Sequence, residues 1–423
     1  MFGGILARRD NPSDREQMNE YQIPYIDLVI VDLYPFEEYV AKGAAHQDII
    51  EKIDIGGISL IRAAAKNYKD VVIVSDKSQY AALAETIRTQ GGCTLEQRYR
   101  YAADAFRASS GYDRAINEYL AGIEHLTLRY GENPHQKAEY VGAAGSLPQQ
   151  LHGKEISYNN MLDIEAAVEL ISDFQEKPTV AVIKHNNACG CAVRETLLQA
   201  WTDALAGDPV SAFGGIIITN RKVDAVTAAE IGKIFFEVIL APAYDDDALE
   251  ILKQKKNRII LVSGNVRPTE KKFRSMLQGR LEQDRDAVAE SPEDLTPTTT
   301  LIPTAEQVED LLFANRIVKH SKSNAIVLAK GGMLLASGIG QTSRVDALKQ
   351  AIAKAGSFGF DLNGAVMASD AFFPFPDCVQ IAHEAGIDAV VHPGGSIRDQ
   401  ESINYCNANN VAMVITGKRH FKH

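Results

Sequence analysis

The stretch Ile26-Asp27-Leu28-Val29-Ile30-Val31-Asp32-Leu33 is largely apolar and β-branched, and it ends at Tyr34-Pro35. A run of this length and composition predicts a buried strand that delivers a loop at its carboxyl end. The segment Asp54-Ile55-Gly56-Gly57 then opens a predicted helix that extends to Ala65, and Val71 to Val74 predicts a second strand. Strand, helix and strand in this order favour a parallel sheet.

Ligands of parallel sheets collect beyond the carboxyl ends of the strands. Tyr34 stands at such an end, and the loops that carry Asp54 and Lys66 flank the predicted helix. We therefore expect these three side chains to converge at one edge of the sheet.

Outward from this unit, Leu95 to about Ile123 predicts a helical segment interrupted at Ser109-Ser110-Gly111. A chain of 423 residues exceeds what one hydrophobic core usually organises, so we place a boundary after this segment and expect domains 1–124 and 125–423. Glu290 to Pro303, rich in proline, threonine and charge, is the best linker between two similar α/β subdomains, about 125–295 and 300–423. Further strands are predicted at Val180–Ile183, Gly215–Thr219, Ile259–Val262, Ala325–Ala329, Ala365–Ala368 and Ala389–Val391.

The net charge of -11 argues against a broad nucleic-acid or anionic-membrane footprint, because those partners are themselves negative. The 5 cysteines include no C-x-x-C pair and form an odd set for a disulfide framework, so we expect reduced thiols in the cytoplasm. No apolar run approaches the roughly 18 residues of a membrane span. The motifs of dinucleotide, P-loop, serine-hydrolase and zinc-deaminase sites are missing, so neither a metal nor a redox cofactor is indicated.

The fragment Val182-Ile183-Lys184-His185-Asn186-Asn187-Ala188-Cys189-Gly190 places a cation and an imidazole directly after a predicted strand. Histidine can move a proton near neutral pH, and an adjacent lysine can stabilise negative charge or hold a phosphate. An exposed loop pair is the ordinary alternative, and the residues alone leave both interpretations open. Cys189-x-Cys191 lacks a second pair, so we interpret it as packing.

Of four other segments, the first three have compositions typical of binding sites. An arginine beside a tyrosine suits a phosphate and a flat ring, small residues let a ligand approach the backbone, and prolines among aromatic residues form a rigid stacking surface. The alternatives for these three are a solvated loop, a strand-entry turn and a core plug, and we interpret the fourth segment by itself as an ordinary basic tail. The segments are Arg129–Gln136, Asp208–Gly215, Ser369–Asp377 and Gly417–His423.

Taken together, these segments resemble the bifunctional AICAR formyltransferase/IMP cyclohydrolase family of de novo purine synthesis. The resemblance runs from the first residues to the last and preserves the order of the motifs. The matching stretches are Gly3–Asp10, Asp32–Phe36, Ile53–Gly57, Ala65–Asn67, the segments around Arg129, Lys184, Phe213, Asn324 and Phe372, and the C-terminal Arg419-x-Phe421-x-His423.

The resemblance implies transfer of a formyl group from 10-formyltetrahydrofolate, a co-substrate rather than a bound cofactor, to the 5-amino group of AICAR. By the same resemblance, His185 assists deprotonation of the amine, Lys184 supports the developing charge, and Asn324 positions the formyl carbonyl. Arg129 and Arg419 are expected to hold the nucleotide phosphate. The remaining expected substrate-binding residues are Tyr130, Asn160, Phe213, Glu237, Phe372, Asp377, Phe421 and His423.

The resemblance also implies a fold and an assembly. The C-terminal region is expected to form two cytidine-deaminase-like α/β/α subdomains and a homodimer with active sites at the interface. The N-terminal region is expected to form part of a methylglyoxal-synthase-like parallel sheet, in which Tyr34, Asp54 and Lys66 close the formylated product to IMP. Family members carry a further strand–helix–strand stretch with a phosphate loop before the position of Met1, so we expect exposed strand edges and impaired ring closure.

Two alternatives belong to other classes of protein. One is a non-catalytic nucleotide-binding module that kept the fold, and the retained set Lys184, His185 and Asn324 argues against it. The other is a zinc-dependent nucleoside deaminase, which would need metal ligands that the sequence does not offer.

Overall fold

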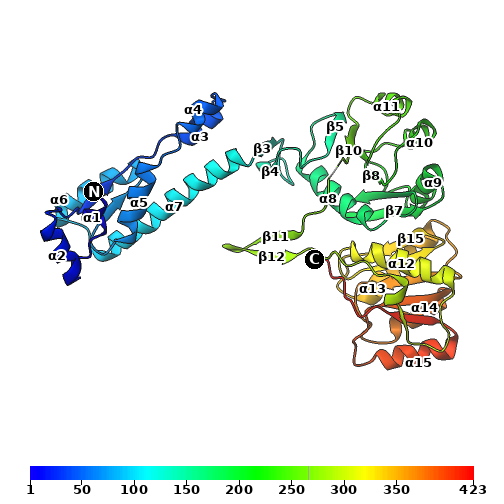
Figure 1. Cartoon of the computed structure of the whole chain (residues 1–423). Coiled ribbons are helices and arrows are strands. Elements are labelled where there is room, and N and C mark those ends of the chain that lie inside the picture. The colour runs from blue at the N-terminus through cyan, green and yellow to red at the C-terminus, as the bar shows by residue number, and fades with distance from the viewer. Residues whose placement is uncertain (265) are drawn as a thin grey trace. The chain divides into compact units, whose positions relative to one another are not determined.

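The computed structural model describes residues 1–264 and 266–423, which form two compact units (Figure 1). Unit 1 comprises Met1–His125 and Val141–Ala144, and unit 2 comprises Leu126–Tyr140 and Gly145–His423. The division falls within the small hairpin of β3 (Ile123–Leu128) and β4 (Ala138–Ala143). The mixed α/β class expected from the sequence is confirmed.

Unit 1 contains the predicted parallel pair of strands, which are shorter than the apolar runs that predicted them. β1 (Leu28–Ile30) pairs in parallel with β2 (Val72–Val74), and in the part of unit 1 that the structure describes they pair only with each other. α5 (Gly56–Lys66) connects them and buries one face. The remaining helical elements are α1 (Phe2–Leu6), α2 (Pro12–Glu20), α3 (Phe36–Ala41), α4 (His46–Ile50), the 3-10 helix Lys77–Gln79, α6 (Tyr80–Gln90) and α7 (Leu95–Leu120).

The predicted interruption of the long helix at Ser109-Ser110-Gly111 is wrong. α7 is continuous over 26 residues and begins with a capping box in which Thr94 and Gln97 satisfy each other's backbone N–H groups. Ser109 is fully buried, and its hydroxyl accepts a hydrogen bond from Arg62 (3.1 Å) on α5. The packing of α7 against α5 therefore offsets the roughly 1 kcal/mol that a glycine costs inside a helix.

Unit 2 is built on one twelve-stranded sheet. Its strand order is β13-β18-β17-β16-β14-β15-β7-β6-β8-β9-β10-β5. The strands are β5 (Gln149–His152), β6 (Thr179–Lys184), β7 (Asn187–Val193), β8 (Ile216–Thr219), β9 (Val238–Ala241), β10 (Ile259–Val262), β13 (Thr296–Pro297), β14 (Ile326–Lys330), β15 (Met333–Gly338), β16 (Ala365–Ser369), β17 (Ile387–His392) and β18 (Ala412–Ile415). A separate hairpin joins β11 (Lys271–Met276) to β12 (Gly279–Asp284).

This order contains an internal repeat, drawn in green for the first copy and in yellow to red for the second (Figure 1). Each copy begins with a helix and a β-hairpin, continues with three helix–strand steps, and has an antiparallel strand at its outer edge. The copies join where β7 meets β15. The helices are α8 (Tyr158–Ser172), α9 (Leu197–Gly207), α10 (Ala225–Ile231) and α11 (Asp246–Lys253) in the first copy, and α12 (Ala305–Lys319), α13 (Arg344–Ser357), α14 (Asp377–Glu384) and α15 (Asp399–Asn409) in the second.

Helices cover both faces of the sheet, so each central strand is buried on both sides. Along β6, Val180 and Val182 point into a core shared with α9 and α13, whereas Ala181 and Ile183 point into a core shared with α8 and α12. This alternation follows from the two-residue period of a strand. The likeness of each copy to the cytidine-deaminase fold stays an expectation.

The predicted linker Glu290–Pro303 connects the two copies, but part of it belongs to the second. It contains the 3-10 helix Pro292–Asp294 and the edge strand β13, which pairs antiparallel with β18. Proline is tolerated in β13 because an edge strand has one side free of ladder hydrogen bonds.

Candidate active site

The predicted lysine–histidine pair lies at the turn of the first hairpin of unit 2. Lys184 ends β6, and His185 and Asn186 form the two-residue turn into β7. Both turn residues have left-handed backbones, with φ of 50° and 63°. Left-handed φ costs an L-residue with a Cβ roughly 1 kcal/mol or more, so this turn is strained.

The second copy of the repeat provides an internal comparison. Its hairpin between β14 and β15 turns at Gly331 and Gly332, with φ of 57° and 66°. Glycine is the ordinary choice for such turns because it adopts positive φ without steric cost. The first copy instead carries an imidazole and a carboxamide at the strained positions, a pattern typical of functional sites.

Lys184 is held by the loop that precedes β8. Its Nζ donates a hydrogen bond to the carbonyl oxygen of Phe213 (2.7 Å). Gly214 follows with φ of 70°, and a Cβ there would lie 3.3 Å from the lysine nitrogen. The Phe213 ring is 63% exposed and packs on one side against Phe235. The Asp208–Gly215 segment therefore supplies the carbonyl group that holds Lys184.

A cavity of about 320 Å³ opens beside this turn, within the size range of small-molecule sites. Asn159 Nδ2 donates to the carbonyl oxygen of Glu132 (3.2 Å), which ties the Arg129–Gln136 segment to the start of α8. Arg129 stacks over the Tyr130 ring and donates to its hydroxyl group (2.8 Å). The residues that line the cavity are Glu132, Asn159, Leu162, Asp163, Lys184, His185, Asn186 and Gly214.

Two predicted substrate-binding residues near this edge have structural partners. Asn160 forms a capping box with Ser157 at the start of α8. Glu237 precedes β9 and pairs with Lys154. Neither residue lines the cavity.

Asn324 lies at the start of β14 on the same edge of the sheet, although it does not line the cavity. Its side chain donates to the carbonyl oxygen of Gln341 (2.9 Å). Asn187 connects the loop that carries Asn324 to the first hairpin. Its Oδ1 accepts from the backbone N–H of Lys322 (3.0 Å), and its Nδ2 donates to the His185 carbonyl oxygen (2.8 Å).

The C-terminal tail packs against this loop in an extended, alternating arrangement. His420 is buried and its backbone N–H donates to the Asp370 carbonyl oxygen (3.1 Å), while Lys422 exchanges hydrogen bonds with Ser323. The residues that alternate with these two, Arg419, Phe421 and His423, are exposed. Arg419 stacks over Phe421, which contacts His423. The three tail residues predicted to bind substrate are thus those that face outward.

A buried ion pair beside the tail was not predicted from the sequence. Asp370 is completely buried, and its carboxylate accepts from Arg344 (2.7 Å) and from the Ser323 hydroxyl (2.6 Å). Phe372 follows two residues later and is partly exposed, and the Asp377 carboxylate accepts from the Cys378 backbone in the first turn of α14. An arginine and an aspartate separated by 26 residues form no recognisable pattern, so no sequence signal could have found this pair.

The three candidates in unit 1 do not all converge. Asp54 accepts from the Gly57 (2.6 Å) and Ile58 (3.2 Å) backbones at the start of α5, whereas Lys66 is the last residue of the same helix. An α-helix rises 1.5 Å per residue, so α5 separates them by about 15 Å along its axis. Tyr34 is 56% exposed, with the Lys52 ammonium 5.9 Å from its ring centre.

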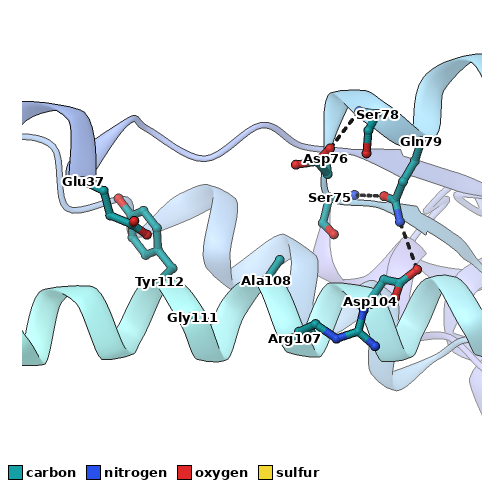
Figure 2. A pocket seen from close by; sticks show the side chains of 10 residues that line it. All are labelled: Glu37, Ser75, Asp76, Ser78, Gln79, Asp104, Arg107, Ala108, Gly111 and Tyr112. Atoms are coloured by element: carbon teal, nitrogen blue, oxygen red, sulfur yellow. Dashed lines mark hydrogen bonds and ion pairs between the residues drawn. The ribbon is translucent and has the colours of Figure 1, made fainter. Parts of the chain in front are cut away.

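A second cavity, of about 520 Å³, lies in unit 1 (Figure 2). None of Tyr34, Asp54 and Lys66 lines it. The Gln79 side chain connects two walls of this cavity, because it accepts from the Ser75 backbone N–H and donates to the Asp104 carboxylate. Asp104 also forms an ion pair with Arg107 (2.7 Å). These groups satisfy one another, so nothing in the cavity identifies a ligand.

Within residues 1–264 and 266–423, no group of three or more histidine, cysteine or acidic side chains is placed to hold a metal ion. Cys189 and Cys191 are buried in β7, and burial raises the pKa of Cys189 to about 12, which suits a packing role. Among the helices of the described chain, none is long and apolar enough to cross a membrane.

A twelve-stranded α/β sheet that presents a lysine, a histidine and a cavity at one edge has the arrangement typical of α/β enzymes. Residues 64–354 match the family described as the AICARFT/IMPCHase bienzyme. The chain belongs to this family, which joins an AICAR formyltransferase to an IMP cyclohydrolase.

Its similarity to individual relatives extends over the whole chain. The "Bifunctional purine biosynthesis protein PurH" of Bacteroides thetaiotaomicron is 62% identical over 434 residues, which cover 100% of this chain and 85% of the relative. Proteins of the same name from Chlorobium phaeobacteroides and Persephonella marina are each 46% identical, again over 100% of this chain and over 86% and 87% of those proteins.

Proposed function

We propose that unit 2 transfers a formyl group from 10-formyltetrahydrofolate to the 5-amino group of AICAR. The observation that carries the proposal is the strained Lys184–His185 turn beside a cavity, in a chain of the AICARFT/IMPCHase family. The amine attacks the formyl carbon, the bond from that carbon to N10 of the folate breaks, and N10 takes up a proton. The products are formyl-AICAR and tetrahydrofolate.

The amine of AICAR is a weak nucleophile because its lone pair is delocalised into the imidazole-carboxamide. In our proposal His185 takes the proton that the amine loses, a role that suits an imidazole near neutral pH. Lys184 stabilises negative charge on the formyl oxygen as the tetrahedral intermediate forms, and Asn324 orients the formyl group. Preorganisation supports these roles, because the Phe213 carbonyl already fixes the Lys184 nitrogen.

Arg129 and Arg419 are proposed to hold the nucleotide phosphate. Each guanidinium stacks on an aromatic ring, of Tyr130 and Phe421 respectively, and a planar guanidinium can make paired hydrogen bonds to phosphate oxygens. The other proposed contacts, to the nucleotide or the folate, are Asn160, Phe213, Glu237, Phe372, Asp377 and His423.

The family's second activity, closure of formyl-AICAR to IMP, is assigned to unit 1 through Tyr34, Asp54 and Lys66. We propose that this activity is weak in the chain, because in the described part of unit 1 β1 and β2 pair only with each other and leave strand edges unpaired. We further propose a cytoplasmic homodimer that completes its formyltransferase sites at the subunit interface.

The test is a transfer assay with the purified chain, AICAR and 10-formyltetrahydrofolate, in which tetrahydrofolate release and formyl-AICAR are measured together. Stoichiometric appearance of both products supports the proposal. A folded chain that binds AICAR in calorimetry but releases neither product contradicts it and favours a nucleotide-binding module.

A further inference from the structure

The two copies of the repeat place an aspartate at the same position of their first helix. Asp163 is the sixth residue of α8, and Asp310 is the sixth residue of α12. We propose that Asp163 is a positioning residue for formyl transfer, which holds the His185–Asn186 turn so that the imidazole faces the cavity. This inference rests on the proposed function of unit 2.

The contacts of the two aspartates are equivalent. Asp163 Oδ1 accepts a hydrogen bond from the backbone N–H of Asn186 (2.7 Å). Asp310 accepts from the backbone N–H groups of Gly331 (2.7 Å) and Gly332 (2.6 Å). In both copies, therefore, a carboxylate from the helix secures the two-residue turn of the following hairpin.

The two turns differ in what else supports them. In the second copy the turn carbonyl groups of Gly331 and Gly332 also accept from the guanidinium of Arg194 (2.7 and 3.2 Å), and glycine removes the backbone strain. In the first copy the His185 carbonyl oxygen accepts from Asn187 Nδ2 (2.8 Å), but both turn residues carry side chains in left-handed backbones, and the turn borders the cavity. The Asp163 hydrogen bond thus opposes a strain that is absent from the second copy.

Asp163 itself lines the cavity together with Lys184 and His185. Burial raises the pKa of its carboxyl group, and the backbone N–H of Asn186 offsets part of this effect. Burying a carboxylate here costs free energy of folding unless the carboxylate makes its hydrogen bond. This agrees with a positioning role for Asp163. A displacement of a catalytic group by 1 Å can lower a rate by about 100-fold.

The experiment compares Asp163→Ala and Asp163→Asn with the matched variants Asp310→Ala and Asp310→Asn, all in the full chain. The kcat, the KM for AICAR and the melting temperature are measured for each. We expect Asp163→Ala to lower kcat by about 10- to 100-fold with a much smaller change in KM, because the imidazole is misplaced rather than the nucleotide lost. The amide oxygen of Asp163→Asn can still accept the Asn186 N–H but forms a weaker hydrogen bond than a carboxylate, so this variant should recover only part of kcat, to less than about half of the wild-type value.

Asp310→Ala should lower the melting temperature by at least as much as Asp163→Ala, because it removes two hydrogen bonds, but it should keep kcat within about threefold of wild type. A wild-type kcat in Asp163→Ala, or an equal loss of kcat in Asp310→Ala, overturns the inference while the proposed function stands. An inactive wild-type chain overturns both. If Asp163→Ala does not fold, the ratio of kcat in Asp163→Asn to that in Asp310→Asn decides: we expect a ratio below one half, and a ratio near one overturns the inference.

Discussion

The Nε2 atom of His420 lies 2.9 Å from a carboxylate oxygen of Glu290, and both side chains are almost completely buried, at 3% and 2% exposure. The other ring nitrogen lies 2.6 Å from Asp286. These contacts anchor the tail that carries Arg419, Phe421 and His423. The position of the outward-facing residues thus depends on a buried imidazole between two acidic groups.

This arrangement predicts a pH-dependent stability. Burial alone would lower the pKa of His420, but the hydrogen bonds to Asp286 and Glu290 outweigh burial and raise the pKa to about 9. Because the folded value exceeds the unfolded value of about 6.5, the stabilisation is complete below pH 6.5 and is lost as the pH rises through 9. It amounts to roughly 3 kcal/mol.

Thermal melts from pH 6 to pH 9.5 test this expectation. The wild-type melting temperature should fall across this window, and His420→Gln should be less stable at pH 6 and lack that part of the slope. Parallel curves for the two proteins would show that His420 does not carry the pH dependence.

Arg419→Ala should raise the KM for AICAR with little change in melting temperature. The arginine is exposed and contacts the Phe421 ring, so its loss should remove a phosphate contact worth about 1.5–3 kcal/mol without disturbing the core. The matched control is Lys418→Ala, which removes an adjacent cation that pairs with Asp294 (2.8 Å). Equal KM values for the two variants would refute a specific role of Arg419.

Replacing the strained turn by that of the second copy should separate stability from activity. In His185→Gly/Asn186→Gly, the two left-handed positions lose their Cβ atoms, so the melting temperature should equal or exceed that of wild type. Formyl transfer should be lost. Gly331→Ala should shift stability in the opposite direction, because φ is 57° there. A marked fall in melting temperature of the double variant would argue that the turn is not strained.

Part of this fold could be predicted from local patterns. β6, β8, β10, β14, β16 and β17 match apolar, β-branched runs in the sequence. β7 and β15 were not predicted, because Asn-Ala-Cys-Gly-Cys-Ala-Val is rich in small residues and β15 directly follows Gly331-Gly332. Those two strands join the copies, so the single continuous sheet could not be foreseen.

Part of the candidate site could likewise be predicted from the sequence, and part of it could not. Lys184 and His185 are adjacent in sequence, and their place after a strand marked them as candidates. Asp163 lies more than twenty positions earlier, on an ordinary helix, and only the fold brings it under the turn. The C-terminal segment has the composition of an ordinary basic tail. Its alternation of anchored and outward-facing residues depends on contacts with Asp370 and Ser323, which are distant in the sequence.

The central claim is that His185, held beside the cavity, accepts the proton from the AICAR amine. It is tested most directly by the rate of formyl transfer of His185→Ala at saturating AICAR and 10-formyltetrahydrofolate. The account predicts a folded protein whose kcat falls by at least about 100-fold, the usual contribution of a general base. A His185→Ala protein that transfers the formyl group at the wild-type rate would contradict it.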